Sequence, residues 1–348
     1  MRILLTADPM IPVPPFGYGG IERIVDALLR EYRSAGHTVA LLAHPDSTAP
    51  ADIHFWWPAS VGHPFRNALA LHQAVRRFQP DVVHSFSRLA YLLPVLPTSQ
   101  RVIMSYQRHT GGSSVTWASR LGGRTLRFTG CSEFICHMGR RAGGTWHAIP
   151  NFVELHKFDF VPSVDPDAPL VFLSRLDDVK GPDLAIAIAR AAKRRLILAG
   201  NRDESGPQRA FFDREIAPHL GRDGIEWIGE VDDAAKNKLL GQAAALLVPI
   251  RWDEPFGIVF AEALACGTPV ISSPRGALPE IVNSGTTGFL IDSVDAGVAA
   301  IGRLSSIDRC ACRRAAENQF TADKVAERYL QLASSLVQNP STPSFKAS

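Results

Sequence analysis

The feature that most constrains the fold is a repeated alternation of short, continuously apolar runs with stretches of helical periodicity. Residues 2–7, "HTVALLAH", "DVVHSF" and "RVIMSY" are typical of buried strands. Between the first two lies "GGIERIVDALLREYRSAG", whose apolar residues recur at helical spacing and which ends at Gly36. Strands and helices in this rhythm predict a parallel sheet with helices on both faces.

The alternation stops near residue 150 and then begins again. The segment "FVPSVDPDAPLVF" holds three prolines and two aspartates and is typical of a linker. After it come a helical stretch, "GPDLAIAIARAAKRR", and the strand-like runs "LVFLSRL", "LILAG", "IEWIG", "ALLVPI", "PVISS" and "GFLID". The sequence therefore predicts an α/β protein with two Rossmann-like, doubly wound parallel-sheet domains. Such sheets bind ligands at the carboxyl ends of their strands, so two that face each other would form a cleft.

The predicted domain boundaries follow from this change of texture. We expect an N-terminal Rossmann-like domain over residues 1–155 and a C-terminal Rossmann-like domain over residues 156–320. Residues 321–348 are expected to form a helix that packs back on the first domain, followed by a disordered tail. A length of 348 residues and an apolar content of 46% are sufficient for two cores.

Charge is unevenly distributed between the two halves. Residues 1–150 contain fifteen Arg, no Lys and eight acids, whereas residues 151–348 contain 22 basic and 26 acidic residues. The net charge of +3 is too small to indicate a nucleic-acid partner. The basic first half fits an anionic acceptor or a peripheral contact with a membrane surface, and uneven composition without any partner explains it equally well.

Cysteine content and hydropathy bear on the cellular compartment. Five cysteines, an odd number without regular spacing, argue against a disulfide framework. The start, "MRILLTADPM", does not fit a signal peptide, and no run approaches the length of a transmembrane span. We expect a cytoplasmic protein, with contact to the inner face of the membrane left open.

The stretch "EPFGIVFAEALACGTPV" places two acids around a helix that is apolar almost all round. Pro255 and Gly267 predict a helix over residues 256–266, and such a helix is buried. An unpaired carboxylate there would cost several kcal/mol, so Glu262 needs a protein donor or ligand hydroxyls as its partner. Glu254 precedes the helix, where the helix dipole favours an anion. Spacing alone leaves open a structural ion pair with an N-terminal acid, or a ligand site.

This stretch resembles the signature of glycosyltransferase family 4, retaining enzymes with two Rossmann-like domains (the GT-B fold). "YGGIERIVDALLREYRSAGHTVALLA", "DVVHSF", "IPNFVELHKF", "LSRLDDVKG", "WIGEV" and "GALPEIVNSGTTGFLID" resemble other segments of that family in the same order. The similarity covers nearly the whole chain. It is weakest over residues 44–80 and 107–130, which should face the acceptor.

The resemblance implies roles for the two acids and their neighbours. Glu254 would contact the donor sugar, and Glu262 would hold the ribose hydroxyls. Backbone N–H groups near Phe256 and Gly257 would reach the sugar and the phosphate.

Two cations in "SRLDDVKG", Arg175 and Lys180, would stabilise the charge that grows on a diphosphate leaving group. Lys180 also precedes a helix that begins at Gly181-Pro182, whose N-terminus would add to the field. The alternative is that both are surface cations paired with Asp177 and Asp178.

Further candidates have weaker signals. Gly19 and Gly20 follow the first strand and would let backbone approach phosphates, while Gly229 would lie against the nucleobase. His109 matches by position a family histidine that touches the donor sugar, and an ordinary loop histidine is the alternative. Glu22 is given a minor role in the first helical turn.

Three further groups are interpreted from the sequence. His84 is interpreted as a core histidine. The "DPD" at 165–167 is interpreted as turn chemistry rather than as a metal site, and no divalent metal is expected. An anionic acceptor or solvent would face the loop arginines Arg108, Arg120, Arg124 and Arg127.

The predicted function is transfer of a sugar, with retention, from a nucleotide diphosphate sugar (UDP- or GDP-linked) to a sugar or lipid-linked acceptor. The resemblance implies a metal-independent, front-face mechanism in which the leaving phosphate takes the acceptor's proton. The alternatives are a nucleotide-sugar epimerase of the same architecture and a non-catalytic nucleotide-sugar-binding protein.

Overall fold

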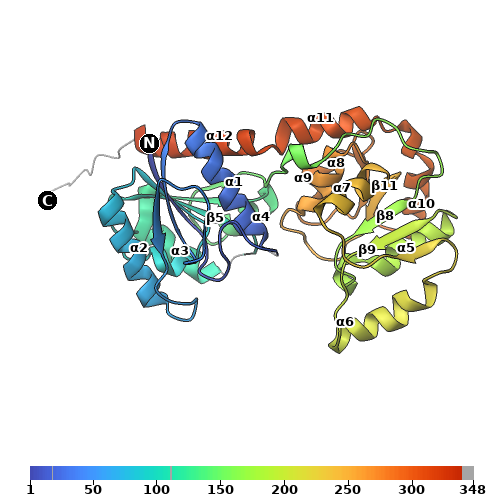
Figure 1. Cartoon of the computed structure of the whole chain (residues 1–348), viewed down its shortest axis with the longest axis horizontal. Coiled ribbons are helices and arrows are strands. Elements are labelled where there is room, and N and C mark those ends of the chain that lie inside the picture. Colours follow the sequence, from blue (N-terminus) through green and yellow to red (C-terminus); the bar gives the residue numbers. More distant parts are fainter. Residues whose placement is uncertain (18, 110–111, 339–348) are drawn as a thin grey trace. The chain divides into compact units, whose positions relative to one another are not determined.

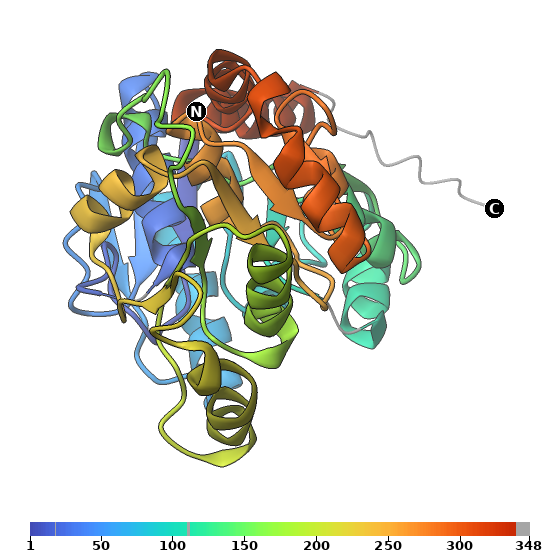
Figure 2. The same cartoon turned by 90° about the vertical axis from the view of Figure 1, so that its right-hand side faces the viewer.

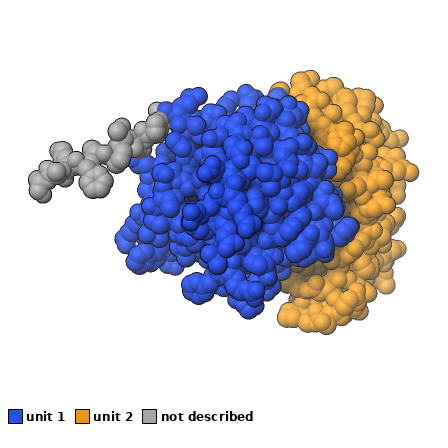
Figure 3. All heavy atoms as spheres, turned by 60° about the vertical axis from the view of Figure 1, so that its left-hand side comes forward, with its two compact units in different colours: residues 1–151, 322–348 blue, residues 152–321 orange. Residues whose placement is uncertain are grey.

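A computed structural model describes residues 1–17, 19–109 and 112–338. The chain forms two compact units, which are coloured separately in Figure 3. Unit 1 consists of Met1–Asn151 and the segment that starts at Ala322, and unit 2 consists of Phe152–Thr321. The tail expected at the C-terminus lies outside the described residues.

Unit 1 contains a seven-stranded, all-parallel sheet in the order β3-β2-β1-β4-β5-β6-β7. Its strands are β1 (Arg2–Thr6), β2 (Thr38–Ala43), β3 (Ile53–Trp56), β4 (Val82–Ser85), β5 (Arg101–Tyr106), β6 (Leu126–Gly130) and β7 (Trp146–Ala148). The strands predicted from apolar runs are β1, β2, β4 and β5, and all four are present. β3, β6 and β7 were not predicted: β3 is a four-residue edge strand without a buried side chain, and β7 has only three residues.

Helices cover both faces of this sheet (Figure 1). They are α1 (Gly20–Ser34), α2 (Pro64–Phe78), α3 (Gly112–Gly122), α4 (Glu133–Arg140) and α12 (Ala322–Gln338), with the 3₁₀ turns η1 (Leu89–Leu92) and η2 (Gly123–Thr125). α12 packs on α1 and β5, and η1 contacts both α2 and α3. Arg101 fixes the end of α12, because its Nε donates to the carbonyl of Leu336 at 2.8 Å.

His84 on β4 is a core histidine, as predicted. Its Nδ1 lies 3.0 Å from the Tyr32 hydroxyl and its Nε2 lies 2.8 Å from Ser105 Oγ. Burial lowers its pKa from the ordinary value of 6.5 to about 3, so the ring is neutral at physiological pH.

Unit 2 contains a six-stranded parallel sheet in the order β10-β9-β8-β11-β12-β13 (Figures 1 and 2). The strands are β8 (Leu170–Leu173), β9 (Leu196–Ala199), β10 (Ile225–Trp227), β11 (Ala245–Val248), β12 (Val270–Ser272) and β13 (Gly288–Leu290). All six were predicted from the sequence. The central β8 and β11 are buried throughout, as continuous apolar runs require.

The helices of unit 2 form two groups. They are α5 (Pro182–Ala191), α6 (Gly206–Phe211), α7 (Asp233–Gly241), α8 (Ile258–Ala265), α9 (Leu278–Ile281), α10 (Val294–Gly302) and α11 (Arg309–Gln319), with the short turns η3 (Leu155–Lys157), η4 (Asp178–Lys180), η5 (Phe212–Ile216), η6 (Ala217–His219) and η7 (Leu304–Ser306). α5 packs against α10, and α8 packs against α7 and α11.

Both sheets reverse their strand order at one place, between β1 and β4 in unit 1 and between β8 and β11 in unit 2. Loops diverge there at the carboxyl ends of the strands, which makes room for a ligand. Of the helices in the described ranges, none combines the length and apolar character needed to cross a bilayer.

Candidate functional site

The loops that follow β8 and β11 pack backbone against backbone at the switch point of unit 2. The Arg251 N–H donates to the carbonyl of Val179 at 2.8 Å. Gly181 has a φ of 73°, and a Cβ there would lie 2.2 Å from the carbonyl oxygen of Pro249. Only glycine permits this approach, so the two loops are held together before any side chain contributes.

The first pair of charges at this edge is Lys180 with Glu254. Lys180 Nζ donates to Glu254 Oε2 at 2.6 Å, and the indole Nε1 of Trp252 donates to the same oxygen at 2.9 Å. The ammonium also lies 4.6 Å from the centroid of the Trp252 ring. Both charged side chains are largely buried, 14% and 12% exposed. Two donors therefore hold a carboxylate in a partly desolvated position.

α8 begins two residues later than predicted. Gly257 has a φ of 82°, in the left-handed region, so it cannot continue a helix and instead caps it. A Cβ on Gly257 would lie 2.6 Å from the Phe260 ring and 3.1 Å from Glu254 Cγ. Pro255 thus stands in the loop before the helix, and the glycine is required by packing within the chain itself.

Glu262 on α8 has a protein partner that was not identified from the sequence. Lys236 Nζ on α7 donates to Glu262 Oε1 at 2.7 Å and lies 3.3 Å from Asp233 Oδ1. The Glu262 side chain is 13% exposed, so it is less buried than the apolar helix pattern predicted. Burial lowers the pKa of Lys236, but attraction to Glu262 and Asp233 outweighs it and the pKa is raised. The structural ion pair left open by the sequence is therefore present.

Arg175 lies two residues after the end of β8 but is not held as Lys180 is. Its guanidinium pairs with Asp177 at 2.8 Å, and its side chain is 59% exposed. Burial raises the pKa of Asp177, and the Arg175 charge opposes that effect. The alternative of pairing with the neighbouring aspartates thus holds for Arg175, whereas Lys180 pairs with Glu254 instead.

The remaining unit 2 candidates are backbone positions and one core side chain. Gly229 follows β10 with a φ of 76° and open space where a Cβ would stand. Phe256 is buried, and its ring packs edge-on against Phe320 at 5.6 Å between centroids. Its side chain is therefore part of the core, which leaves only its backbone for a ligand.

Within unit 1, the two candidate glycines differ. Gly19 caps α1, and a Cβ there would lie 2.7 Å from Pro15 Cβ, so packing within the loop requires it. Gly20 has open space around it. Glu22, in the first turn of α1, is buried, and burial raises its pKa while its own backbone hydrogen bond opposes this.

His109 lies in the loop after β5 and is exposed. Its ring packs edge-on against Phe134 at 5.6 Å between centroids. Of the four candidate arginines of unit 1, Arg127 donates to the carbonyls of Arg124 and Leu126, and it is half-buried. The other three are exposed: Arg108, Arg120 and Arg124.

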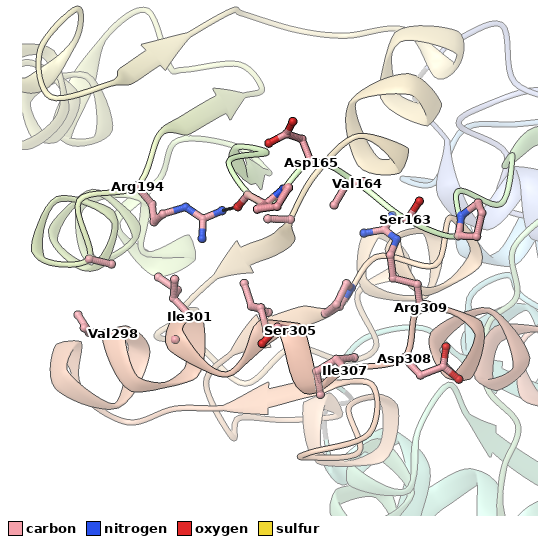
Figure 4. A pocket seen from close by; sticks show the side chains of 17 residues that line it. Ser163, Val164, Asp165, Arg194, Val298, Ile301, Ser305, Ile307, Asp308 and Arg309 are labelled. Carbon is pink, nitrogen blue, oxygen red and sulfur yellow. Dashed lines mark hydrogen bonds between the residues drawn. The ribbon is translucent and has the colours of Figure 1, made fainter.

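The "DPD" segment forms a turn, as predicted, because Asp165 Oδ1 accepts from the Asp167 N–H at 2.8 Å. It borders a cavity of about 740 Å³ near the amino ends of the unit 2 strands, shown in Figure 4. None of the candidate site residues lines this cavity. Across the ranges that the structure describes, no three His, Cys, Asp or Glu side chains are grouped to hold a metal ion.

Two family profiles divide the chain between them. The profile described as "Glycosyltransferase Family 4" matches residues 18–157, and that described as "Glycosyl transferases group 1" matches residues 157–319.

Individual relatives are similar over most of their length. The chain is 32% identical over 340 residues to the phosphatidyl-myo-inositol mannosyltransferase of Mycolicibacterium smegmatis, covering 86% of this chain and 83% of the relative. It is 27% identical to the glycogen synthase of Mycobacterium tuberculosis, covering 93% and 91%. The solved structure of AviGT4, a glycosyltransferase of avilamycin A biosynthesis, superimposes with a TM-score of 0.70 at 27% identity, over 97% and 98% of the two chains.

Proposed function

The chain belongs to glycosyltransferase family 4, with the two-domain GT-B fold, and from that premise we propose that it transfers a hexose from a UDP- or GDP-linked sugar with retention at the anomeric carbon. The observation that carries the proposal is the pair of lysine–glutamate contacts at the carboxyl edge of the unit 2 sheet. Lys180–Glu254 and Lys236–Glu262 lie on the loops and helices next to the switch point, where a ligand of this chemistry would bind.

The proposed roles divide the donor among these side chains. Lys180 and Arg175 bind the diphosphate, Glu254 contacts the sugar, and Glu262 accepts hydrogen bonds from the ribose hydroxyls. The open space at Gly229 suits a nucleobase against backbone. The backbone N–H groups near Phe256 and Gly257 donate hydrogen bonds to the sugar and the phosphate.

The protein partners of the two acids are compatible with these roles. An ammonium has three N–H donors, and Glu254 takes one from Lys180, which leaves two for phosphate oxygens. A carboxylate has about four acceptor sites, so Glu262 can keep Lys236 and still accept from hydroxyls. The contact of Lys236 with Asp233 maintains its charge compensation if Glu262 turns toward the ligand.

The contacts of Glu254 also favour a front-face mechanism over a double displacement. A carboxylate that already accepts from Lys180 and Trp252 is a poor nucleophile toward the anomeric carbon. In the proposed step the bond from the anomeric carbon to the leaving phosphate breaks as the acceptor oxygen attacks from the same face. The departing phosphate takes the acceptor's proton. Fixed cations stabilise the leaving charge, so no metal is required.

The predicted domain of residues 1–155 is proposed as the acceptor side, and that of residues 156–320 as the donor side. Gly19, Gly20 and His109 are proposed to contribute to donor binding. An excess of arginine in the first half favours an acceptor that carries phosphate or a lipid diphosphate over a neutral one. We propose a cytoplasmic location for the enzyme, where nucleotide sugars are available.

The test is a calorimetric binding screen of UDP, GDP and their sugars, followed by incubation of the bound donor with candidate acceptors. The proposal expects one nucleoside diphosphate to bind in the micromolar range and an NMR spectrum that shows retained anomeric configuration. An inverted product contradicts the mechanism. Turnover of the donor without any acceptor indicates an epimerase, and binding without turnover against sugar and lipid-linked acceptors indicates a binding protein.

A further inference from the structure

Unit 1 exposes large apolar side chains on the layer formed by α2, η1 and α3. Phe65 on α2 is 88% exposed, Trp117 on α3 is 63% exposed, and Leu69 on α2 is 56% exposed. Leu93, next to η1, and Leu121, on α3, are also exposed. Because η1 contacts both helices, these side chains belong to one layer of the unit, as Figure 1 shows for α2 and α3.

The core of unit 1 does not need these side chains. α2 buries Leu71, Ala74 and Phe78 on its inner side, while Phe65 and Leu69 stand one turn apart on the outer side. α3 likewise buries Val115 and Ala118 and exposes Trp117 and Leu121. Helices that are apolar on the outside as well as the inside mark a surface that meets a partner.

The same segment carries uncompensated positive charge. Residues 53–132 contain nine arginines, no lysine and a single acid, Asp81. Arg66 on α2, Arg120 on α3 and Arg124 directly after it are exposed. Within the described ranges, none of these three is within ion-pair distance of a carboxylate. The Arg120 guanidinium lies 5.9 Å from the centroid of the Trp117 ring.

We propose that this surface, the arginine–aromatic face (Phe65, Leu69, Leu93, Trp117 and Leu121 with Arg66, Arg120 and Arg124), docks on a lipid bilayer that contains anionic lipids. Aromatic rings suit the headgroup level of a bilayer, aliphatic side chains enter the acyl boundary, and arginines pair with lipid phosphates. Charge complementarity selects this occupant. A nucleic acid would offer the three exposed leucines no apolar surface to contact. A second copy of the chain would present the same excess of positive charge, so the two faces would repel each other.

The inference rests on the proposed function in one respect: a face that binds the bilayer brings unit 1 to a lipid-linked acceptor. Docking on the bilayer involves only unit 1, so the docking proposal can be tested independently of the donor site. Affinity for the donor diphosphate, measured in solution without vesicles, therefore separates failure of this inference from failure of the proposed function.

The experiment is co-sedimentation of the full chain with phosphatidylcholine vesicles and with vesicles that also contain phosphatidylglycerol. The wild type is expected to bind only the anionic vesicles, and added salt should weaken the binding. The combined variant Arg66→Gln, Arg120→Gln and Arg124→Gln should lower the partition coefficient at least about tenfold, since each arginine near an anionic surface contributes to binding. Phe65→Ser with Trp117→Ser should lower it by a similar factor.

A matched control removes the same number of exposed arginines from unit 2: Arg195→Gln, Arg214→Gln and Arg222→Gln. Its partition coefficient should stay within about twofold of wild type, because these side chains lie outside the face. Thermal unfolding checks that every variant folds. We expect all of them to fold, because the substituted residues are exposed. The proposal would be overturned if the wild type did not bind anionic vesicles, or if the control variant lost as much vesicle binding as the face variants. It would also be overturned if the face variants altered only the oligomeric state or the retention of an RNA probe.

Discussion

The carboxyl edges of the two sheets hold their acids in different ways. In unit 2, Glu254 and Glu262 each accept a hydrogen bond from a lysine, at 2.6 and 2.7 Å. In unit 1, Asp8 and Glu22 are largely buried and their pKa values are raised by burial. The guanidinium of Arg88 lies 3.8 Å from the Asp8 carboxylate.

This difference shows where each unit keeps its charge. In unit 2 each acid has a lysine partner in a partly desolvated place, so under the proposed function the charges already stand in position for a diphosphate and for hydroxyls. Unit 1 buries Asp8 and Glu22 with weak compensation and exposes several arginines, which makes part of its outer surface basic. A preorganised electrostatic site is thus expected in unit 2 and a docking function in unit 1.

The largest effect is expected from removing both cations next to β8. Arg175→Ala with Lys180→Ala should lower turnover about a thousandfold, because the leaving diphosphate loses its stabilising charge. Stability should fall by only about 1–2 kcal/mol, because Trp252 still donates to Glu254. Steady-state kinetics and chemical denaturation measure the two quantities. Lys157→Ala, which removes a half-exposed pair with Glu154, is the control and should leave turnover unchanged. Parallel losses of activity and stability would favour a structural role.

The second effect compares the two edges directly. Glu254→Gln keeps the shape of the side chain but removes the charge that faces Lys180, so turnover should fall about a hundredfold. Glu22→Gln makes the same change in unit 1, where burial already disfavours the charge, and should cost much less. Steady-state turnover of the two folded variants measures this difference. A fully active Glu254→Gln would remove this residue from the site.

A pH effect on stability is expected from unit 1. The pKa of His84 is about 3 in the folded chain against an ordinary 6.5, so between these values the unfolded chain binds more protons. Stability is therefore complete above pH 6.5 and falls as pH decreases, by about 2 kcal/mol at pH 5. Urea unfolding of wild type and His84→Asn at pH 7 and 5 isolates this contribution. An equal pH dependence in both proteins would contradict it.

The sequence was sufficient for the two-domain α/β architecture and for the position of the two candidate acids around α8. Apolar runs predicted every strand of unit 2, and the spacing of Glu254 and Glu262 predicted two carboxylates around α8. In unit 1 the strands β3, β6 and β7 were missed, and the short, half-exposed β3 leaves no such run. Lys236 was missed because its pairing joins two helices across 26 residues, which no local pattern reveals.

Glycines show a second limit of sequence reasoning. Gly19 and Gly257 were interpreted as positions where the backbone approaches a ligand, yet contacts with Pro15 and Phe260 already require a glycine at each. A glycine in a sequence does not show whether its missing side chain makes room for a ligand or for the chain. That distinction depends on backbone angles and neighbours that only the folded structure supplies.

The most direct test of the account is the affinity of Glu262→Ala for the nucleoside diphosphate that the wild type binds, measured by calorimetry. If Glu262 holds the ribose in addition to Lys236, affinity should fall about tenfold, the value of one or two hydrogen bonds to a charged group. Lys236→Met is the companion variant, since it breaks the same ion pair and leaves the carboxylate in place. Weaker binding in a folded Glu262→Ala is the predicted result. Unchanged affinity, with a loss of stability equal to that of Lys236→Met, would contradict the account.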